Sequence, residues 1–303
     1  MLRQLQQLES KYPVSSIAFS RDGRLATDSP GIVSIWEADR QGQLYQVQQL
    51  EYKVDFVSPG PMVFSPDGRL AIANSMNVLM WETDQRGRLQ QVQQLETGRI
   101  INSVTFSPDG HQLATGGGNP VSIWEKDLQG RLHQAQKLKS HFVHSIAFSP
   151  DGRRLAAGGN SPEVLIWEAD QQGRFQEVRR LNHGHDVNLV TFSHDGRLMT
   201  SSLGKVLIWK ENGQGLLRVV QKLQVGGRNI RSADFSLDGQ LAIAQDGKKG
   251  RVLILKADPE RRLQQVQELM QRRASVAFSP NGRLATIAEG KEPGKILIWE
   301  AGM

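Results

Sequence analysis

The sequence predicts an all-β fold in which seven copies of one four-stranded antiparallel unit follow one another along the chain. Two recurring markers predict it. A Phe-Ser-x-Asp/Asn-Gly segment returns every 42 to 45 residues, beginning at Phe19, Phe64, Phe106, Phe148, Phe192, Phe235 and Phe278. A β-branched segment follows each copy and ends at Trp36, Trp81, Trp124, Trp167, Trp209, Leu255 and Trp299.

Each unit is expected to contain four short strands in a fixed order. The first is apolar, as in "SIAFS", and the Asp-Gly that follows it supplies the positive backbone angles of a tight hairpin turn. The second strand, "RLAT", returns along the first. The third is the "VxIW" segment, and a Gly-containing connection leads to a fourth, Gln-rich strand such as "LQQVQQLE".

The Gln-rich segments also fit a second interpretation. Leu89, Val92 and Leu95 recur at intervals of three, which suits an amphipathic helix. A strand is favoured because the preceding connection has hairpin length, and because an outermost strand that faces solvent on one side is expected to be polar.

A single four-stranded sheet with two apolar faces needs neighbours on both sides. Sheets stacked around an axis meet this need, and the recurrent Phe and Trp side chains, each burying roughly 150 to 250 Å², would fill the gaps between them. The fold predicted is therefore a seven-bladed β-propeller that occupies residues 1–303 as a single domain, with no separate catalytic domain. The last unit stops at "ILIWEAGM" without its Gln-rich strand, so we expect residues 2–9, "LRQLQQLE", to complete the last blade and close the ring.

The segments "VAFSPNGRLAT" followed by "ILIWE", and "IAFSPDGRRLAAGG" followed by "VLIWE", resemble the WD-repeat family of seven-bladed propellers. The resemblance covers the entire chain. It implies a rigid, non-enzymatic platform that binds proteins, peptides or occasionally nucleic acid on its faces and rim.

The chain departs from the family pattern in three respects. The Trp-Asp dipeptide is replaced by Trp-Glu or Trp-Lys, and the Gly-His dipeptide is clear only at Gly184-His185. The Asp that family members often carry six residues before the Trp is absent. These departures predict that the family's His-Ser-Asp-Trp hydrogen-bond network is mostly missing.

Composition limits the classes of protein that remain. The chain has no Cys, a formal net charge of +6, and no apolar run near the roughly 20 residues that span a bilayer. Its N-terminus lacks the apolar core of a signal peptide. We expect a cytoplasmic monomer that does not contact membranes.

Basic residues gather in one sector of the predicted ring. The connections between blades and those between the second and third strands share one face, called here the top face. In the sixth and seventh units these connections hold nine basic residues against three acidic ones, and they include the two longest loops of their class, "AQDGKKGR" and "IAEGKEPGK". The sequence predicts a partner-binding site here, formed by Arg228, Arg231, Lys248, Lys249, Arg251, Arg272, Arg273, Lys291 and Lys295. Solvated surface charge is the alternative interpretation.

Other clusters predict no chemistry. His141, His144, His183 and His185 come in two pairs whose spacing would allow a zinc ion, but no further ligand is evident, so turn histidines are favoured. The Asp residues of the Asp-Gly turns are spaced one per blade and cannot meet as a catalytic pair. The Gly-rich runs "ATGGGN" and "AAGGN" lack the Lys-Ser/Thr of a phosphate loop. We expect no catalytic residues, no metal and no cofactor.

The function predicted is a non-enzymatic interaction scaffold that binds an acidic protein or peptide on the top face. A nucleic-acid-binding propeller is the second hypothesis, although aromatic residues are not interleaved with the basic ones. A carbohydrate-binding propeller would need an exposed aromatic residue in each blade, and the chain has only three Tyr. The similarity of the units also fits recent duplication or consensus design without a specific ligand.

Overall fold

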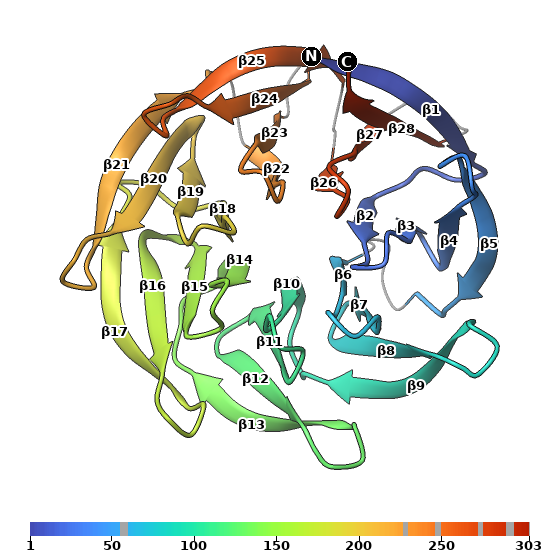
Figure 1. Cartoon of the computed structure of the whole chain (residues 1–303). Coiled ribbons are helices and arrows are strands. Elements are labelled where there is room, and N and C mark those ends of the chain that lie inside the picture. The colour runs from blue at the N-terminus through green and yellow to red at the C-terminus, as the bar shows by residue number, and fades with distance from the viewer. Residues whose placement is uncertain (55–59, 227–229, 246–249, 272–274, 289–293, 303) are drawn as a thin grey trace.

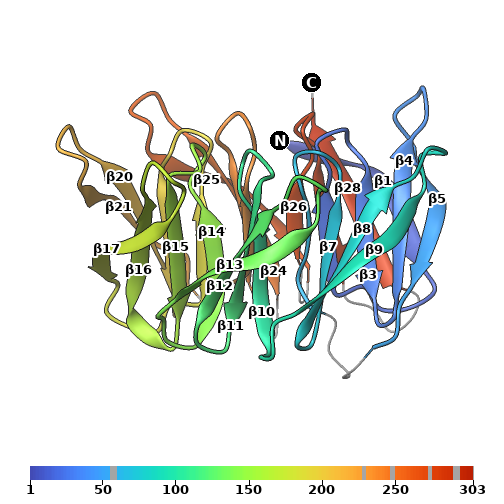
Figure 2. The same ribbon diagram turned by 90° about the horizontal axis from the view of Figure 1, so that it is seen from below.

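The computed structural model describes residues 1–54, 60–226, 230–245, 250–271, 275–288 and 294–302. Seven four-stranded antiparallel sheets stand around a central axis, which confirms the predicted propeller (Figure 1). Viewed along the edge of the disc, the strands run between its two faces (Figure 2). Blade 1 consists of β2 to β5, each later blade takes the next four strands, and blade 7 consists of β26 to β28 with β1.

The strands occupy four radial positions. The innermost strands are β2 (Ser16–Phe19), β6 (Met62–Phe64), β10 (Ile101–Phe106), β14 (Val143–Phe148), β18 (Leu189–Phe192), β22 (Ile230–Phe235) and β26 (Val276–Phe278). The second strands are β3 (Leu25–Ser29), β7 (Leu70–Asn74), β11 (Gln112–Gly117), β15 (Arg154–Gly159), β19 (Leu198–Ser202), β23 (Leu241–Gln245) and β27 (Leu284–Ala288). The third strands are β4 (Ile32–Ala38), β8 (Asn77–Thr83), β12 (Val121–Lys126), β16 (Ser161–Ala169), β20 (Lys205–Glu211), β24 (Arg251–Ala257) and β28 (Gly294–Ala301). The outer strands are β5 (Leu44–Glu51), β9 (Leu89–Glu96), β13 (Leu132–Leu138), β17 (Phe175–Asn182), β21 (Leu217–Gln224), β25 (Leu263–Met270) and β1 (Leu2–Ser10).

The N-terminal strand closes the ring as predicted. β1 pairs antiparallel with β28, from Leu2 opposite Ala301 to Ser10 opposite Gly294. The two ends of the described chain therefore lie side by side in blade 7 (Figure 1). The Gln-rich segments are strands in all seven blades, so the helical interpretation is wrong.

The apolar core lies between the blades. Each of seven buried clusters combines side chains from two neighbouring sheets. Trp81 of blade 2 packs with Ile35 of blade 1, whereas Met80, the adjacent residue, packs with Phe106 of blade 3. Because successive side chains point to opposite faces of a sheet, each blade buries one face against each neighbour.

The Asp-Gly segments form one hydrogen-bonded turn in each blade, on the bottom face. In blade 3 the Ser107 hydroxyl donates to Asp109 Oδ1 at 2.5 Å, and Gly110 adopts a φ of 72° that L side chains rarely take. The same Ser and Asp or Asn pair recurs at Ser20 and Asp22, Ser65 and Asp67, Ser149 and Asp151, Ser193 and Asp195, Ser236 and Asp238, and Ser279 and Asn281. The recurring carboxylates therefore stabilise turns.

The Glu that stands in place of Asp after a Trp has a structural role in three blades. Glu37 accepts from the guanidinium of Arg24, the residue after the Asp-Gly turn of the same blade, at 3.0 Å. Blades 2 and 4 repeat the pair, with Arg69 and Glu82 at 3.0 Å and Arg154 and Glu168 at 2.6 Å. Glutamate is one methylene longer than aspartate, and this extra reach brings the carboxylate to the arginine.

Part of the hydrogen-bond network that WD-repeat proteins form around the Trp is present. The indole Nε1 of Trp36 donates to Thr27 Oγ1 at 3.0 Å within blade 1. Three further blades contain the same bond, at 2.9 to 3.2 Å, in Trp124 to Thr115, Trp209 to Thr200 and Trp299 to Thr286. Blade 2 has Ile72 at the Thr position, and Trp81 Nε1 is buried without a partner among the described residues.

The glutamines of the outer strands link neighbouring blades. Gln48 of blade 1 reaches the first residue of the outer strand of blade 2: its Nε2 donates to Leu89 O at 2.7 Å, and its Oε1 accepts from Leu89 N at 2.9 Å. We call this two-bond contact a glutamine bridge. Five further blade boundaries contain it, at 2.5 to 3.0 Å, in Gln6 to Leu44, Gln93 to Leu132, Gln136 to Phe175, Gln221 to Leu263 and Gln267 to Leu2.

Replacing Gln48 with Leu should weaken the fold because the Leu89 N–H and C=O lose both side-chain partners. We expect the free energy of unfolding, measured by urea denaturation, to fall by about 1 to 2 kcal/mol. Gln49→Leu is the control, because Gln49 is exposed and its side chain makes no hydrogen bond within the described part of the chain; it should change stability by less than about 0.5 kcal/mol. Equal effects of the two variants would contradict a stabilising bridge.

Thr27→Val should leave the buried indole N–H of Trp36 without an acceptor. The expected loss of stability is about 1 to 3 kcal/mol, the cost of an unsatisfied buried donor. In a Trp36→Phe background the same replacement should cost about 0.5 kcal/mol or less, since no donor remains. Thermal and urea unfolding of the wild type, the two single variants and the double variant measure the difference. Equal losses of stability in both backgrounds would contradict a stabilising role for this hydrogen bond.

Candidate interaction surfaces

The predicted basic site lies mostly outside the described residues. Six of its nine members fall there, namely Arg228, Lys248, Lys249, Arg272, Arg273 and Lys291. Arg231, Arg251 and Lys295 are described, and the structure places them on strands of blades 6 and 7.

Arg251 holds its own blade together. Its guanidinium donates to Gln245 Oε1 at 2.8 Å, to the Val225 carbonyl at 2.7 Å and to Glu268 at 3.3 Å. These three contacts tie the beginning of β24 to β23, to the connection before blade 6 and to the outer strand. Arg251 therefore anchors the top of blade 6.

The other two described members differ in setting. Lys295 is half-buried on β28 and lies opposite Glu9 of β1, an opposite-charge cross-strand pair. Arg231 is exposed on β22, one residue after that strand begins. Of the three, Arg231 presents its side chain most openly to solvent.

The histidines do not converge. His183 is buried, and burial lowers the pKa of its imidazole because the charged form loses its hydration. His185 is exposed, and His144 lies on β14, where its Nε2 is 2.6 Å from Asn160 Oδ1. Within the described ranges, no three His, Cys, Asp or Glu side chains are arranged as a metal site would require.

Two acids with raised pKa values were not anticipated from the sequence. Asp28, at the top end of β3, is inaccessible to solvent; burial raises its pKa to about 7, although a hydrogen bond from the Tyr52 hydroxyl at 2.9 Å opposes the shift. Asp234 lies on the innermost strand of blade 6. Burial raises its pKa to about 6, and its Oδ2 accepts from Phe278 N of blade 7 at 2.7 Å. The second acid thus bridges two blades near the axis.

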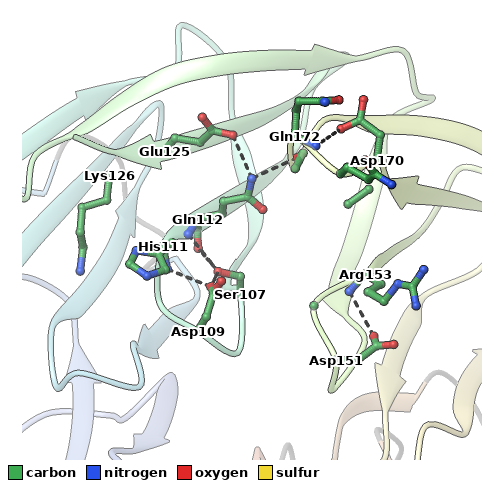
Figure 3. A pocket seen from close by; sticks show the side chains of 14 residues that line it. Ser107, Asp109, His111, Gln112, Glu125, Lys126, Asp151, Arg153, Asp170 and Gln172 are labelled. Atoms are coloured by element: carbon green, nitrogen blue, oxygen red, sulfur yellow. Dashed lines mark hydrogen bonds between the residues drawn. The ribbon is translucent and has the colours of Figure 1, made fainter. Parts of the chain in front are cut away.

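A groove opens on the bottom face between blades 3 and 4 (Figure 3). Its volume is about 800 Å³. The turn after β10 contributes Asp109 and His111, and the turn after β14 contributes Asp151 and Arg153. The end of β12 and the turn before β17 supply the remaining polar wall, with Glu125, Lys126, Asp170 and Gln172.

A glutamine follows the Asp-Gly turn at this boundary, where five blades have an arginine. In four of those blades the arginine donates to the hairpin of the next blade, as when Arg69 donates to the Gly130 carbonyl at 2.6 Å and Arg283 to the Gly42 carbonyl at 2.5 Å. In blade 3 the position is Gln112, whose shorter side chain reaches Gly173 O at 3.3 Å. The sequence shows this glutamine in "DGHQLA", and Gln240 holds the same position in the "DGQLA" of blade 6.

The groove provides no arrangement for nucleophilic catalysis. Ser107 donates directly to Asp109 Oδ1, and no imidazole lies between the hydroxyl and the carboxylate. Burial raises the pKa of Asp109, but hydrogen bonds from the Ser107 hydroxyl and the His111 backbone N–H outweigh it and hold that pKa below its usual range. The pair therefore belongs to the turn that every blade contains.

An apolar hollow lies at the bottom mouth of the central channel. It has a volume of about 690 Å³ and is lined mainly by Phe and Pro side chains from the innermost turns, with Leu237 exposed at its edge. The recurrent Phe-Ser-Pro segments thus meet around the axis.

Seven radially arranged four-stranded sheets define the chain as a seven-bladed β-propeller. Residues 89–125, 132–168 and 175–210 match the family model described as "WD domain, G-beta repeat". These three matches and the seven-bladed propeller support the resemblance to the WD-repeat family. Each match begins on an outer strand and ends one residue before the end of the third strand of the next blade, so the sequence repeat is offset from the blade by one strand.

Comparison with solved structures agrees with this assignment. A chain in the structure described as "Crystal Structure of Mitotic Checkpoint Complex" superposes with a TM-score of 0.81 over 99% of this chain and 92% of that chain. The sequence identity is 18%, so the likeness concerns the fold. Comparison with curated proteins gives no match. The part of the chain that the structure describes contains no helix long and apolar enough to cross a membrane.

Asp28 should make stability depend on pH between about 4 and 7. Its carboxyl has a reference pKa of 3.8 and a folded pKa of about 7, so below pH 4 both states are protonated and the group contributes nothing. As pH rises further only the unfolded state ionises, which lowers the free energy of unfolding until about pH 7. Asp28→Asn should reduce this slope and raise stability at pH 8 by about 2 to 4 kcal/mol.

Urea unfolding at several pH values measures the slope. Tyr52→Phe is the companion variant, because it removes the hydrogen bond that favours the Asp28 carboxylate and should extend the loss of stability to higher pH. A wild-type slope unchanged by Asp28→Asn would contradict the assignment.

Proposed function

We propose that this WD-repeat propeller is a non-enzymatic scaffold that binds an acidic protein or peptide on the top face of blades 6 and 7. WD-repeat propellers are typically protein-interaction platforms, and the structural neighbour of similar fold is a chain of a protein complex. The observation that carries the proposal is the sequence's concentration of nine basic and three acidic residues in the top-face connections of two adjacent blades and at the strand ends beside them.

Charge at this sector would act mainly during encounter. Basic groups clustered on one side of a disc attract an acidic partner over distances of about 8 Å at physiological salt and orient it before contact. Of the described members, Arg251 is held by three contacts within blade 6, and Lys295 lies opposite Glu9 in blade 7. Arg231 is the described member best placed to meet a partner. A monomer in the cytoplasm is part of the same proposal.

Reversing the charge of Arg228, Arg231, Arg272 and Arg273 to Glu should abolish capture of acidic partners from a lysate of the source cell. The expected loss is at least about tenfold, because four repulsive charges replace four attractive ones at the contact. Affinity capture followed by mass spectrometry compares the two proteins.

The matched control reverses four exposed arginines of other turns and hairpins, namely Arg40, Arg86, Arg131 and Arg174, to Glu. It changes net charge equally but leaves the top sector intact, so it should retain the partners. Undiminished capture by the first variant would place the binding site elsewhere.

A further inference from the structure

The six glutamine bridges define a binding geometry that the seventh blade boundary lacks. Each bridging glutamine stands opposite the residue that precedes the Trp or Leu of its own blade, as Gln136 stands opposite Ile123 and Gln221 opposite Ile208. Its carboxamide then satisfies both the N–H and the C=O of the first residue of the next outer strand. These backbone groups point away from their own sheet, toward the preceding blade.

Between blades 4 and 5 the position of the glutamine is taken by Arg179. Arg179 stands opposite Ile166, the same register, and is half-buried like the glutamines. A glutamine at this position would reach Leu217, the first residue of β21, which is the neighbouring outer strand (Figure 1). No side chain among the described residues bonds to the Leu217 N–H or C=O, and the Arg179 guanidinium has no hydrogen-bond or ion-pair partner there.

Arg179 supplies the cation of this gap, and the acids around it are already engaged: Glu177 accepts from Arg180 at 2.6 Å, and Glu211 accepts from Arg154 at 2.6 Å. Arg218 follows Leu217 and pairs with Lys210, so both of these side chains lie on the opposite face of blade 5, toward blade 6.

We propose that this gap, the rim notch formed by Arg179 and the Leu217 backbone, binds a Glu or Asp carboxylate from an acidic segment of a partner protein. One carboxylate oxygen accepts from the Leu217 N–H, as the glutamine oxygen does in the other six boundaries, and the other accepts from Arg179. A guanidinium has five N–H donors, so Arg179 can also donate to the Leu217 carbonyl, replacing the glutamine NH₂.

Exposed apolar surface borders the notch and suits an extended protein segment. Val178 and Val220, which lie next to it on β17 and β21, are 49% and 54% exposed. An acidic segment lying along the rim would therefore contact both charge and apolar side chains. The rim notch is separate from the top-face sector, and either site can fail its test without affecting the other.

A fluorescein-labelled hexaglutamate peptide, followed by fluorescence anisotropy at low salt, provides the test. Arg179→Gln should reduce its affinity by at least about tenfold, since it removes the cation and lets a seventh glutamine bridge occupy Leu217. Arg131→Gln removes the same charge from an exposed turn of blade 3 and should stay within about twofold of the wild type.

Amide hydrogen exchange at Leu217 separates the notch from general charge. Exchange should slow when the peptide binds the wild-type protein, and should be slow without peptide in Arg179→Gln. Arg179→Leu should lose the peptide but leave the Leu217 amide fast, because leucine supplies no acceptor.

Three results would overturn the proposal. The first is equal peptide affinity for wild type and Arg179→Gln, and the second is equal binding of a neutral hexaglutamine peptide. The third is tighter, Arg179-dependent binding of an oligothymidylate, which would assign the notch to nucleic acid.

Discussion

A sheet with two apolar faces cannot be stable alone, and this constraint organises the whole molecule. Every blade buries one face against each neighbour, so an open row of seven would leave two apolar faces in water. Pairing of β1 with β28 removes both exposed faces at once. The seven clusters between blades then form a continuous ring of core in which no blade is terminal.

Polar side chains hold the blades in register around that core. Arginines after the Asp-Gly turns reach the next hairpin on the bottom face, and glutamines reach the next outer strand on the rim. Both contacts use side chains whose targets are backbone groups, so they tolerate variation in the neighbour's side chains. Arg179 replaces the glutamine at one boundary, and Gln112 and Gln240 replace the arginine at two others, so these positions differ between blades that otherwise share one pattern.

The repeat fixed by Phe-Ser-x-Asp-Gly and Trp predicted the blade number, the strand order and the closing strand, because local turn chemistry and period-two patterning determine them. It did not predict the partners of the outer glutamines, since "LQQVQQLE" shows polarity but not which carboxamide crosses to the next blade. The sequence also did not predict the ion pair between Glu82 and Arg69. The sequence predicted the positive charge of the basic site. The structural role of Arg251 became clear only from its contacts in the structure.

The meeting of the two ends in blade 7 has a consequence for how the chain can be connected. Leu2 and Ala301 face each other at the end of a strand pair, the position that a five-residue hairpin, Asp39 to Gln43, occupies in blade 1. A short peptide joining them would yield a covalent circle with the same blades. Such a circle could be cut at any exposed hairpin, so the ring has no intrinsic first residue.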